Sequence, residues 1–255
     1  MERIKMVAAD LDDTLVRPDK SISDETKRVF GECAKRGILT AFATARLAVS
    51  TDREEQELKP HIRIVSNGAM VLKGRDPVLF RAIDRGELNR FLERLVRLGA
   101  DGVYVGGREH VYTNCKNYRY SRTLKQSIYC DLSDPIEEET CQVFFRIKDG
   151  EKVDELQKEF SLLSWITYRD GTYAVTAPGV SKAKALLEIA GKYGIEPAGI
   201  AAFGDDEGDL EMLQVCGMGV AMGNALPSVK AGAAYVTKSN EEDGVAWFMD
   251  RYILR

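Results

Sequence analysis

The chain has 255 residues, and its 36 Lys and Arg against 40 Asp and Glu leave a formal net charge of −4. This mild negative charge argues against nucleic-acid binding through a basic surface. Hydrophobic residues make up 44% and charged residues 30% of the sequence, proportions that exclude global disorder. At about 150 residues per domain, the length predicts between one and two domains.

No apolar run approaches the ~20 residues that span a membrane, and residues 1–5 are not followed by the apolar core of a secretory signal. The five cysteines are scattered and form no Cys-x-x-Cys pair, so neither a disulfide framework nor a zinc site is expected. These features predict a cytoplasmic protein without a membrane partner. They carry no signal for a particular oligomeric state.

The first part of the chain alternates short apolar runs with helical patterns. Strands are expected at 4–9, 38–43 and 62–65, and a helix that opens at Ser23 and stops at Gly37 separates the first two. Alternation at this spacing indicates a parallel sheet with helices on both faces. A β-hairpin is expected next, from its two apolar runs around a Gly- and Pro-containing turn.

The pattern changes near residue 84, where the apolar residues begin to alternate with polar ones. Such alternation is typical of a sheet with one face exposed to solvent. Strands are expected at 103–105, 110–113, 141–147, 165–168 and 173–176, and helices at 88–96 and 153–160. We therefore expect a second, α+β domain in this region, with 114–136 as its least readable part.

The α/β pattern returns after residue 178. Helices are expected at 182–193, 210–215 and 244–252, and strands at 200–203, 219–222 and 235–237. The predicted fold class is therefore α/β. A Rossmann-like parallel-sheet core, formed by residues 1–83 and 179–255, is interrupted by an inserted α+β domain at residues 84–178.

Three of the expected core strands end in polar side chains. Asp10 and Asp12 follow the first strand, Thr44 follows the second, and Asp205 and Asp209 follow a strand of the C-terminal part. Ligands of open α/β sheets bind beyond the carboxyl ends of the strands, so these residues are expected to converge. Four carboxylates in one crevice repel each other unless a cation lies among them. Oxygen ligands without nearby Cys or His favour Mg²⁺ over zinc or copper.

Lys182 and Thr44 complete a site that suits a phosphate group. An ammonium and a hydroxyl supply the positive charge and the hydrogen-bond donors that a phosphate requires. An Asp beside them can attack phosphorus and form an aspartyl-phosphate. A second Asp two residues later can protonate the leaving group and then activate water. The sequence thus favours phosphoryl transfer from a small phosphorylated metabolite.

These residues fall into four motifs that occur in a fixed order. They are Asp10-Leu11-Asp12-Asp13-Thr14-Leu15, Thr44-Ala45-Arg46, Val180-Ser181-Lys182 and Gly204-Asp205-Asp206-Glu207-Gly208-Asp209. Their order and spacing resemble the haloacid dehalogenase superfamily of phosphatases, and within it the Cof-type sugar-phosphatase branch, whose first motif is DxDxT. The stretches 66–69, 219–225 and 237–245 also resemble this branch, so the resemblance covers both core segments.

The resemblance implies roles for the four carboxylates. Asp10 would be the nucleophile and a metal ligand. Asp12 would be the general acid and base, and its main-chain carbonyl would bind Mg²⁺. Asp205 would bind the metal directly, and Asp209 through water or Lys182.

The resemblance also implies how the substrate is held. Thr44 and Lys182 would bind the phosphoryl oxygens, while Asn67 and Asn224 would line the site near the substrate. The inserted domain would be the cap of this branch, which closes over the site and selects the substrate.

Two residues depart from the pattern of the branch. Ala45 stands where the second motif usually has Gly, which would alter the phosphate loop if that Gly needs a positive φ. Gly208 stands where the acidic motif usually has Asn, and it removes a side-chain hydrogen bond. Neither departure removes a group that would touch phosphate or metal.

Simpler interpretations exist for the same residues. Asp10 and Asp12 also suit a solvated acidic turn, and Asp205 and Asp209 suit the negatively charged first turn of a helix. Lys182 also suits a helix surface. A basic and aromatic stretch in the inserted domain is most often a solvated face, although it also suits contact with substrate; its cations are Lys116, Arg119, Arg122 and Lys125.

The function that the sequence favours is Mg²⁺-dependent hydrolysis of a small phosphorylated metabolite, with a sugar phosphate as the first candidate. Two alternatives belong to other classes. A phosphosugar-binding sensor with weak turnover would be consistent with Ala45 and Gly208. A receiver-like signalling domain would also use an acidic pair, a Thr and a Lys, but its acceptor Asp ends the third strand, where this chain has Ser66 and Asn67.

Overall fold

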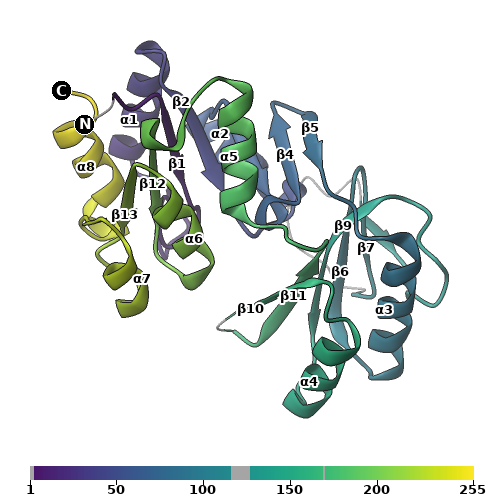
Figure 1. Cartoon of the computed structure of the whole chain (residues 1–255). Coiled ribbons are helices and arrows are strands. Elements are labelled where there is room, and N and C mark those ends of the chain that lie inside the picture. The colour runs from purple at the N-terminus through teal and green to yellow at the C-terminus, as the bar shows by residue number, and fades with distance from the viewer. Residues whose placement is uncertain (1–2, 116–126, 169) are drawn as a thin grey trace. The chain divides into compact units, whose positions relative to one another are not determined.

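The computed structural model describes residues 3–115, 127–168 and 170–255 (Figure 1). Its internal contacts divide the chain into two compact units. The first comprises Met1–Ala45, Thr51–Val78 and Ser181–Arg255, and the second comprises Arg46–Ser50 and Leu79–Val180. The chain therefore also enters the second unit briefly at Arg46–Ser50, beginning at the last residue of the second motif.

The first unit is built on an eight-stranded sheet in the order β14-β13-β12-β1-β2-β3-β4-β5. Its strands are β1 (Met6–Ala9), β2 (Leu39–Ala43), β3 (Ile62–Val65), β4 (Met70–Lys73), β5 (Asp76–Phe80), β12 (Ile200–Gly204), β13 (Met218–Ala221) and β14 (Tyr235–Val236). Its helices are α1 (Asp24–Lys35), α2 (Asp52–Leu58), α5 (Lys182–Lys192), α6 (Glu207–Val215), α7 (Pro227–Gly232) and α8 (Gly244–Tyr252).

The order of the strands places a topological switch point at β1. From β1 the chain moves outward through β2 and β3, and it later returns to β12 on the other side of β1, with parallel pairing throughout. Right-handed crossovers then place α1 and α2 on one face of the sheet and α6 and α7 on the other. Accordingly, α1 packs against α2 and α8, while α6 packs against α5 and α7 (Figure 1).

Helices on both faces explain why the central strands are buried. Every residue of β1, β3, β12 and β13 is buried, as expected for parallel strands covered on two sides. The helices are delimited by local signals. Ser23 accepts a hydrogen bond from Thr26 N at the start of α1, and Gly37, with a φ of 71°, follows its end.

The second unit contains a six-stranded sheet in the order β10-β11-β9-β6-β7-β8, which is antiparallel except for the β7–β8 pair. Its strands are β6 (Asp101–Gly107), β7 (Val111–Thr113), β8 (Ser127–Tyr129), β9 (Thr140–Arg146), β10 (Ser164–Thr167) and β11 (Thr172–Thr176). Two helices, α3 (Arg85–Arg97) and α4 (Gly150–Glu159), pack on one face of this sheet (Figure 1).

The structure confirms the predicted fold class, an α/β core with a parallel sheet plus a smaller α+β part. The helix α7 and the strand β8, which are six and three residues long, were not predicted from the sequence. The helix α6 begins earlier than predicted, because Glu207, Gly208 and Asp209 belong to its first turn rather than to a loop. Among the described residues, no helix combines the length and apolarity needed to cross a lipid bilayer.

Candidate active site

Two neighbouring strands of the core sheet each end in a buried aspartate. β1 and β12 pair in parallel with Ala9 opposite Phe203. Asp10 directly follows β1, and Asp205 directly follows β12; each is less than a tenth exposed. The Asp10 main-chain N–H donates to the Phe203 carbonyl at 3.0 Å. Parallel pairing therefore delivers the two carboxylates to the same edge of the sheet.

Asp209 adds a third carboxylate from the first turn of α6. One of its oxygens, Oδ2, accepts hydrogen bonds from the main-chain N–H groups of Asp205 at 3.0 Å and Asp206 at 3.2 Å. This folds the acidic segment back on the helix that follows it. Gly204 is required for the fold-back, because a Cβ there would lie 2.4 Å from the Cβ of Asp209.

Lys182 joins these acidic groups. It is the first residue of α5, whose N-terminus is capped by the hydroxyl of Ser181, which accepts from Lys184 N. Its Nζ lies 2.7 Å from Oδ1 of Asp10 and 2.7 Å from Oδ1 of Asp209, and the side chain is only 7% exposed. A buried ammonium thus bridges two aspartates that are far apart in the sequence.

The charges of this cluster are not balanced. Asp10, Asp205 and Asp209 can each offer an oxygen within 4.8 Å of the others, and one ammonium faces these three carboxylates. Burial, together with the charge of Asp209, raises the pKa of Asp205 to about 7. Burial also raises the pKa of Asp10, more strongly than the Lys182 charge lowers it. Burial opposes the charge of Lys182, but the two aspartates outweigh it and raise the pKa of Lys182.

This excess of negative charge tests whether the cluster suits the expected metal ion. A divalent cation among the three carboxylates would supply the missing positive charge. The donor atoms are all oxygens, which suits Mg²⁺. Because both oxygens of Asp209 already accept hydrogen bonds, Asp10 and Asp205 are the side chains best placed for direct ligation. The residues present therefore fit a divalent cation.

Thr14 is a further residue of the site, and its role was not predicted from the sequence. Its hydroxyl donates to Oδ1 of Asp205 at 2.8 Å, and both side chains are buried although 191 positions separate them. This bond fixes the orientation of the Asp205 carboxylate. A signal was present, because Thr14 is the last residue of the DxDxT motif, but the motif does not reveal its partner.

Asp12 differs from the three buried aspartates. Its side chain is 42% exposed, and one oxygen lies 3.5 Å from Nζ of Lys20, which is itself exposed. Asp12 also forms an isolated bridge with Val16, so the loop after β1 turns back immediately. An exposed carboxyl two residues after Asp10 is accessible to a leaving group and to water.

The next two strands position Thr44 and Asn67. Thr44 follows β2 and is buried, and its carbonyl accepts from the main-chain N–H of Asn67 at 3.0 Å. Asn67 lies in the turn Ser66–Gly68 after β3 and has a φ of 56°. Such left-handed backbone is uncommon for residues other than glycine and is enriched at functional sites. Both residues therefore lie at the same edge of the sheet as Asp10.

Asn224 has a structural position in this fold. Its side-chain Nδ2 donates to the carbonyl of Asp13 at 2.7 Å, and its Oδ1 accepts from Asn240 N at 3.0 Å. The amide thus ties the loop after β1 to the C-terminal part of the core. A contact between Asn224 and substrate stays a prediction.

The two departures from the motif pattern lie in permissive places. The backbone of Ala45 does not adopt the left-handed conformation that would require glycine. Gly208 lies in the exposed first turn of α6, and a Cβ there would meet nothing within 4 Å. The basic stretch with Lys116, Arg119 and Arg122 lies outside the described residues.

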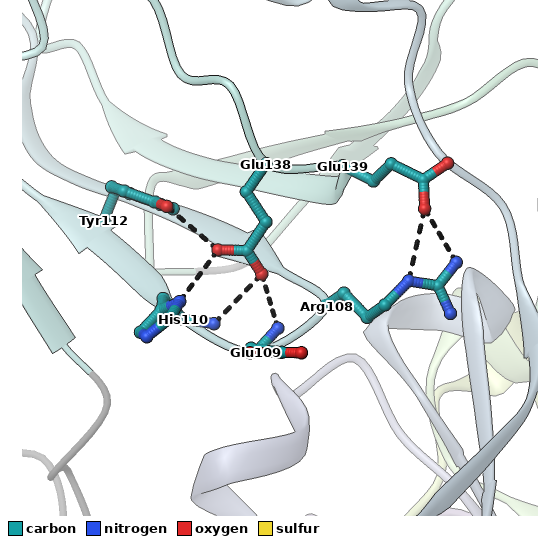
Figure 2. A pocket seen from close by; sticks show the side chains of 6 residues that line it. All are labelled: Arg108, Glu109, His110, Tyr112, Glu138 and Glu139. Atoms are coloured by element: carbon teal, nitrogen blue, oxygen red, sulfur yellow. Dashed lines mark hydrogen bonds and ion pairs between the residues drawn. The ribbon is translucent and has the colours of Figure 1, made fainter.

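A second polar cluster lines a pocket of about 380 Å³ in the second unit (Figure 2). The Glu138 carboxylate accepts from the main-chain N–H groups of Glu109 and His110, from His110 Nδ1 at 3.0 Å and from the Tyr112 hydroxyl at 2.9 Å. Arg108 pairs with the neighbouring glutamate, Glu139. Both oxygens of the Glu138 carboxylate therefore accept hydrogen bonds that hold the turn between β6 and β7. The contact with Glu138 accounts for the position of the His110 side chain without a bound ligand.

A family profile described as haloacid dehalogenase-like hydrolase matches residues 7–249. The chain belongs to this family. The family predicted from the sequence is thereby confirmed, and the hydrolase is an enzyme rather than a receiver-like signalling domain.

Individual relatives agree with this assignment. The Bacillus subtilis protein YitU, named 5-amino-6-(5-phospho-D-ribitylamino)uracil phosphatase, is 28% identical to this hydrolase over 267 residues, which cover 97% of each chain. A Streptococcus pyogenes protein whose name joins a phosphatase to a peptidyl-prolyl cis-trans isomerase is 29% identical over 98% of this hydrolase. The hydrolase spans only 54% of that longer relative.

Solved structures show the same fold. BT1666 from Bacteroides thetaiotaomicron, described among phosphatases of this superfamily, superimposes with a TM-score of 0.85. The two are 25% identical, and the match covers 99% of this hydrolase and 96% of BT1666. Sequence and structure comparisons thus both lead to phosphatases.

Proposed function

We propose that this hydrolase removes the phosphate group from a small phosphorylated metabolite, with a sugar phosphate as the first candidate, through an aspartyl-phosphate on Asp10. The observation that carries the proposal is the buried cluster in which the Lys182 ammonium lies 2.7 Å from both Asp10 and Asp209. A nucleophilic carboxylate, a cation for the phosphoryl oxygens and further oxygen ligands are then present at one edge of the sheet.

The chemistry requires two steps. In the first, a carboxylate oxygen of Asp10 attacks phosphorus, the bond to the ester oxygen breaks, and Asp12 gives that oxygen its proton. In the second, Asp12 takes a proton from water, whose oxygen attacks phosphorus and releases inorganic phosphate from Asp10. Lys182 and Thr44 would hold phosphoryl oxygens in both steps, as donors for the charge that develops there.

We assign Mg²⁺ as the cofactor, held by Asp10, Asp205 and the main-chain carbonyl of Asp12, with Asp209 acting indirectly. When bound, it would neutralise negative charge on the transferred phosphoryl group. Support comes from the excess of carboxylates over ammonium groups and from the all-oxygen donor set. The free cysteines, of which Cys33, Cys141 and Cys216 are buried, are consistent with the cytoplasmic location expected from the sequence.

The test is a phosphate-release assay over a panel of phosphorylated metabolites, with Mg²⁺ and with a chelator. The panel includes hexose phosphates and the phosphorylated ribitylaminouracil for which YitU is named. Turnover that needs Mg²⁺ and disappears in Asp10→Asn is expected, because an amide is a poor nucleophile. Turnover that survives exhaustive chelation, or wild-type rates in Asp10→Asn, would overturn the mechanism. Tight binding without turnover would favour the sensor.

A further inference from the structure

Two asparagine side chains from the C-terminal part of the core hold the loop that follows β1. Nδ2 of Asn224 donates to the carbonyl of Asp13 at 2.7 Å. Nδ2 of Asn240 donates to the carbonyl of Val16 at 3.1 Å, in a buried hydrogen bond. The partners are 211 and 224 positions apart in the sequence, and all four residues belong to the first unit. Two distant segments of one unit are therefore joined at this loop.

Both carbonyls belong to residues that determine where Asp12 lies. Asp13 is its neighbour in the chain and has a φ of 58°, in the left-handed region that is strained for residues other than glycine. Val16 forms the isolated bridge with Asp12, and its main-chain N–H donates to the carbonyl of Leu11 at 2.7 Å. A shift of either residue would therefore move Asp12 as well.

Asn240 is itself held by the chain around it. Its side chain is buried, and its Oδ1 accepts from Glu241 N at 3.1 Å. Its own main-chain N–H donates to Oδ1 of Asn224 at 3.0 Å, which links the two asparagines. The preceding residue, Ser239, packs so closely on Gly223 that a Cβ there would lie 2.6 Å from Ser239 N. The linked asparagines thus form one fixed support for the loop.

An ion pair joins the same two segments but contributes less. Nη2 of Arg17 lies 2.7 Å from Oδ1 of Asp243, and each side chain is 30% exposed. Ion pairs that solvent reaches stabilise a protein only weakly. The buried hydrogen bond from Asn240 is therefore the contact on which the position of the loop depends most.

We propose that Asn240, supported by Asn224, is a positioning residue that keeps the Asp12 carboxyl beside the ester oxygen of the bound substrate. This inference rests on the proposed function, in which Asp12 protonates the leaving group. A general acid must lie within hydrogen-bond distance of the atom that it protonates, and a displacement of about 1 Å can lower the rate about 10²-fold. Because the Asp12 side chain is exposed, burial does not fix it, and its position depends on the main chain that Asn240 holds.

The experiment compares two esters that differ in how much their leaving group needs a proton. p-Nitrophenolate departs as a stable anion, whereas the phenolate of phenyl phosphate is a poor leaving group without an acid. In Asn240→Ala, kcat/KM for phenyl phosphate should fall about 10- to 100-fold. For p-nitrophenyl phosphate it should fall less than about threefold. Equal losses on both esters would reveal general damage to the fold and overturn the inference.

Thr237→Val is the matched control. Thr237 is as buried as Asn240, and its hydroxyl donates to the carbonyl of Gly244 at 2.6 Å, so this bond stays within the C-terminal segment. Both variants should lower the melting temperature by about 2–6 °C, as expected for loss of one buried hydrogen bond. Thr237→Val should leave the ratio of the two kcat/KM values unchanged, and a change as large as in Asn240→Ala would contradict a specific role for Asn240.

A double variant tests whether Asn240 acts through Asp12. In Asp12→Asn the acid is already absent, so adding Asn240→Ala should lower kcat/KM for phenyl phosphate by less than about threefold further. A further loss as large as the one that Asn240→Ala causes alone would show that the two residues act independently, against the proposal.

Hydrogen exchange separates this inference from the proposed function, because it requires no turnover. Main-chain amides of residues 10–20 should exchange about tenfold faster in Asn240→Ala than in the wild type or in Thr237→Val. Faster exchange upholds the hold of Asn240 on the loop even if the wild type hydrolyses neither ester, a result that counts against the proposed function alone. Exchange at the wild-type rate in Asn240→Ala overturns the inference.

Discussion

Gly68 packs so closely against Ser181 that a Cβ at residue 68 would lie 2.3 Å from the Ser181 carbonyl oxygen. Gly68 also has a φ of 96°, in the left-handed region. Ser181 caps α5, and the next residue is Lys182. The turn after β3 therefore fixes the start of the helix that supplies the only lysine in the carboxylate cluster described here.

Gly68→Ala should impair stability and catalysis together. The strain of left-handed backbone and the clash with Ser181 together predict a loss of about 2–4 kcal/mol in the free energy of unfolding. Any relaxation moves the start of α5 and hence Lys182, so kcat should fall as well. Urea unfolding and phosphate release measure the two effects. Gly31→Ala is the control: Gly31 lies in α1 with nothing within 4 Å of a Cβ, so about 0.5–1 kcal/mol of stabilisation is expected.

Lys182→Met should leave two buried carboxylates without their counter-ion. Removing one partner of a buried ion pair typically costs about 3–5 kcal/mol, so the free energy of unfolding measured in urea should fall by that amount. Turnover should be lost as well. The double variant Lys182→Met/Asp10→Asn should recover much of the stability but no activity, because the second change removes one uncompensated charge. Equal stability of the single and double variants would show that the pair contributes nothing.

Asp12→Asn should affect rate without affecting stability. Because the side chain is exposed and lies outside the Lys182 cluster, the melting temperature should not change. General acid–base groups contribute about 10²- to 10⁴-fold, so kcat should fall by a factor in that range. The main-chain carbonyl remains, so the Mg²⁺ concentration for half-maximal activity should stay the same. If the affinity for Mg²⁺ falls in parallel with the rate, the Asp12 side chain is itself a ligand.

Mg²⁺ should stabilise the folded hydrolase. A ligand that binds only the native state adds about 2.7 kcal/mol at one hundred times its dissociation constant, so thermal unfolding should move upward as Mg²⁺ is added. In Asp205→Asn this rise should disappear, since a buried ligand is lost. Ca²⁺ and Na⁺ at matched ionic strength are the controls. A rise that persists undiminished in Asp205→Asn would place the cation elsewhere.

His61 should make the protein less stable in mild acid. Its Nδ1 accepts from the main-chain N–H of Thr40 at 3.1 Å, and only the neutral ring can do so. Burial, helped by the charge of Lys73, lowers the pKa of His61 below its ordinary 6.5. The unfolded state therefore binds more protons, so stability is fully present above pH 6.5 and is lost as the pH falls below it. His61→Asn, which keeps an acceptor but does not titrate, should show a smaller loss between pH 7 and pH 5 in urea unfolding.

Much of the site could be predicted because the carboxyl ends of parallel strands meet at one edge. Asp10, Thr44 and Asp205 each directly follow an apolar run that predicts a strand. Their place at the carboxyl ends of parallel strands was therefore enough to predict that they lie close together. Lys182 required the motif order, since its Ser181 cap signals a helix start but says nothing of what lies opposite.

Other features depended on long-range packing. The sequence pattern predicted a helix only from residue 210, yet Asp209 lies in the first turn of α6 and accepts from the main chain of Asp205. α7 has only six residues, which is too few for a helical repeat of apolar residues to be recognised in the sequence. The hydrogen bond between Thr14 and Asp205 appears only once β1 and β12 are known to be neighbours, because 191 positions separate the two residues in the sequence.

The position of β1 between β2 and β12 has a consequence for protein synthesis. β2 follows β1 within some thirty residues, whereas β12 leaves the ribosome only after the whole of Leu79–Val180. The second unit is thus complete in the nascent chain while one edge of β1 still lacks its neighbour, an order in which independent domains fold one after another. Asp10 acquires Lys182, Asp205 and Asp209 only after that, so a polypeptide released early carries the proposed nucleophile without the charged groups that surround it in the folded core.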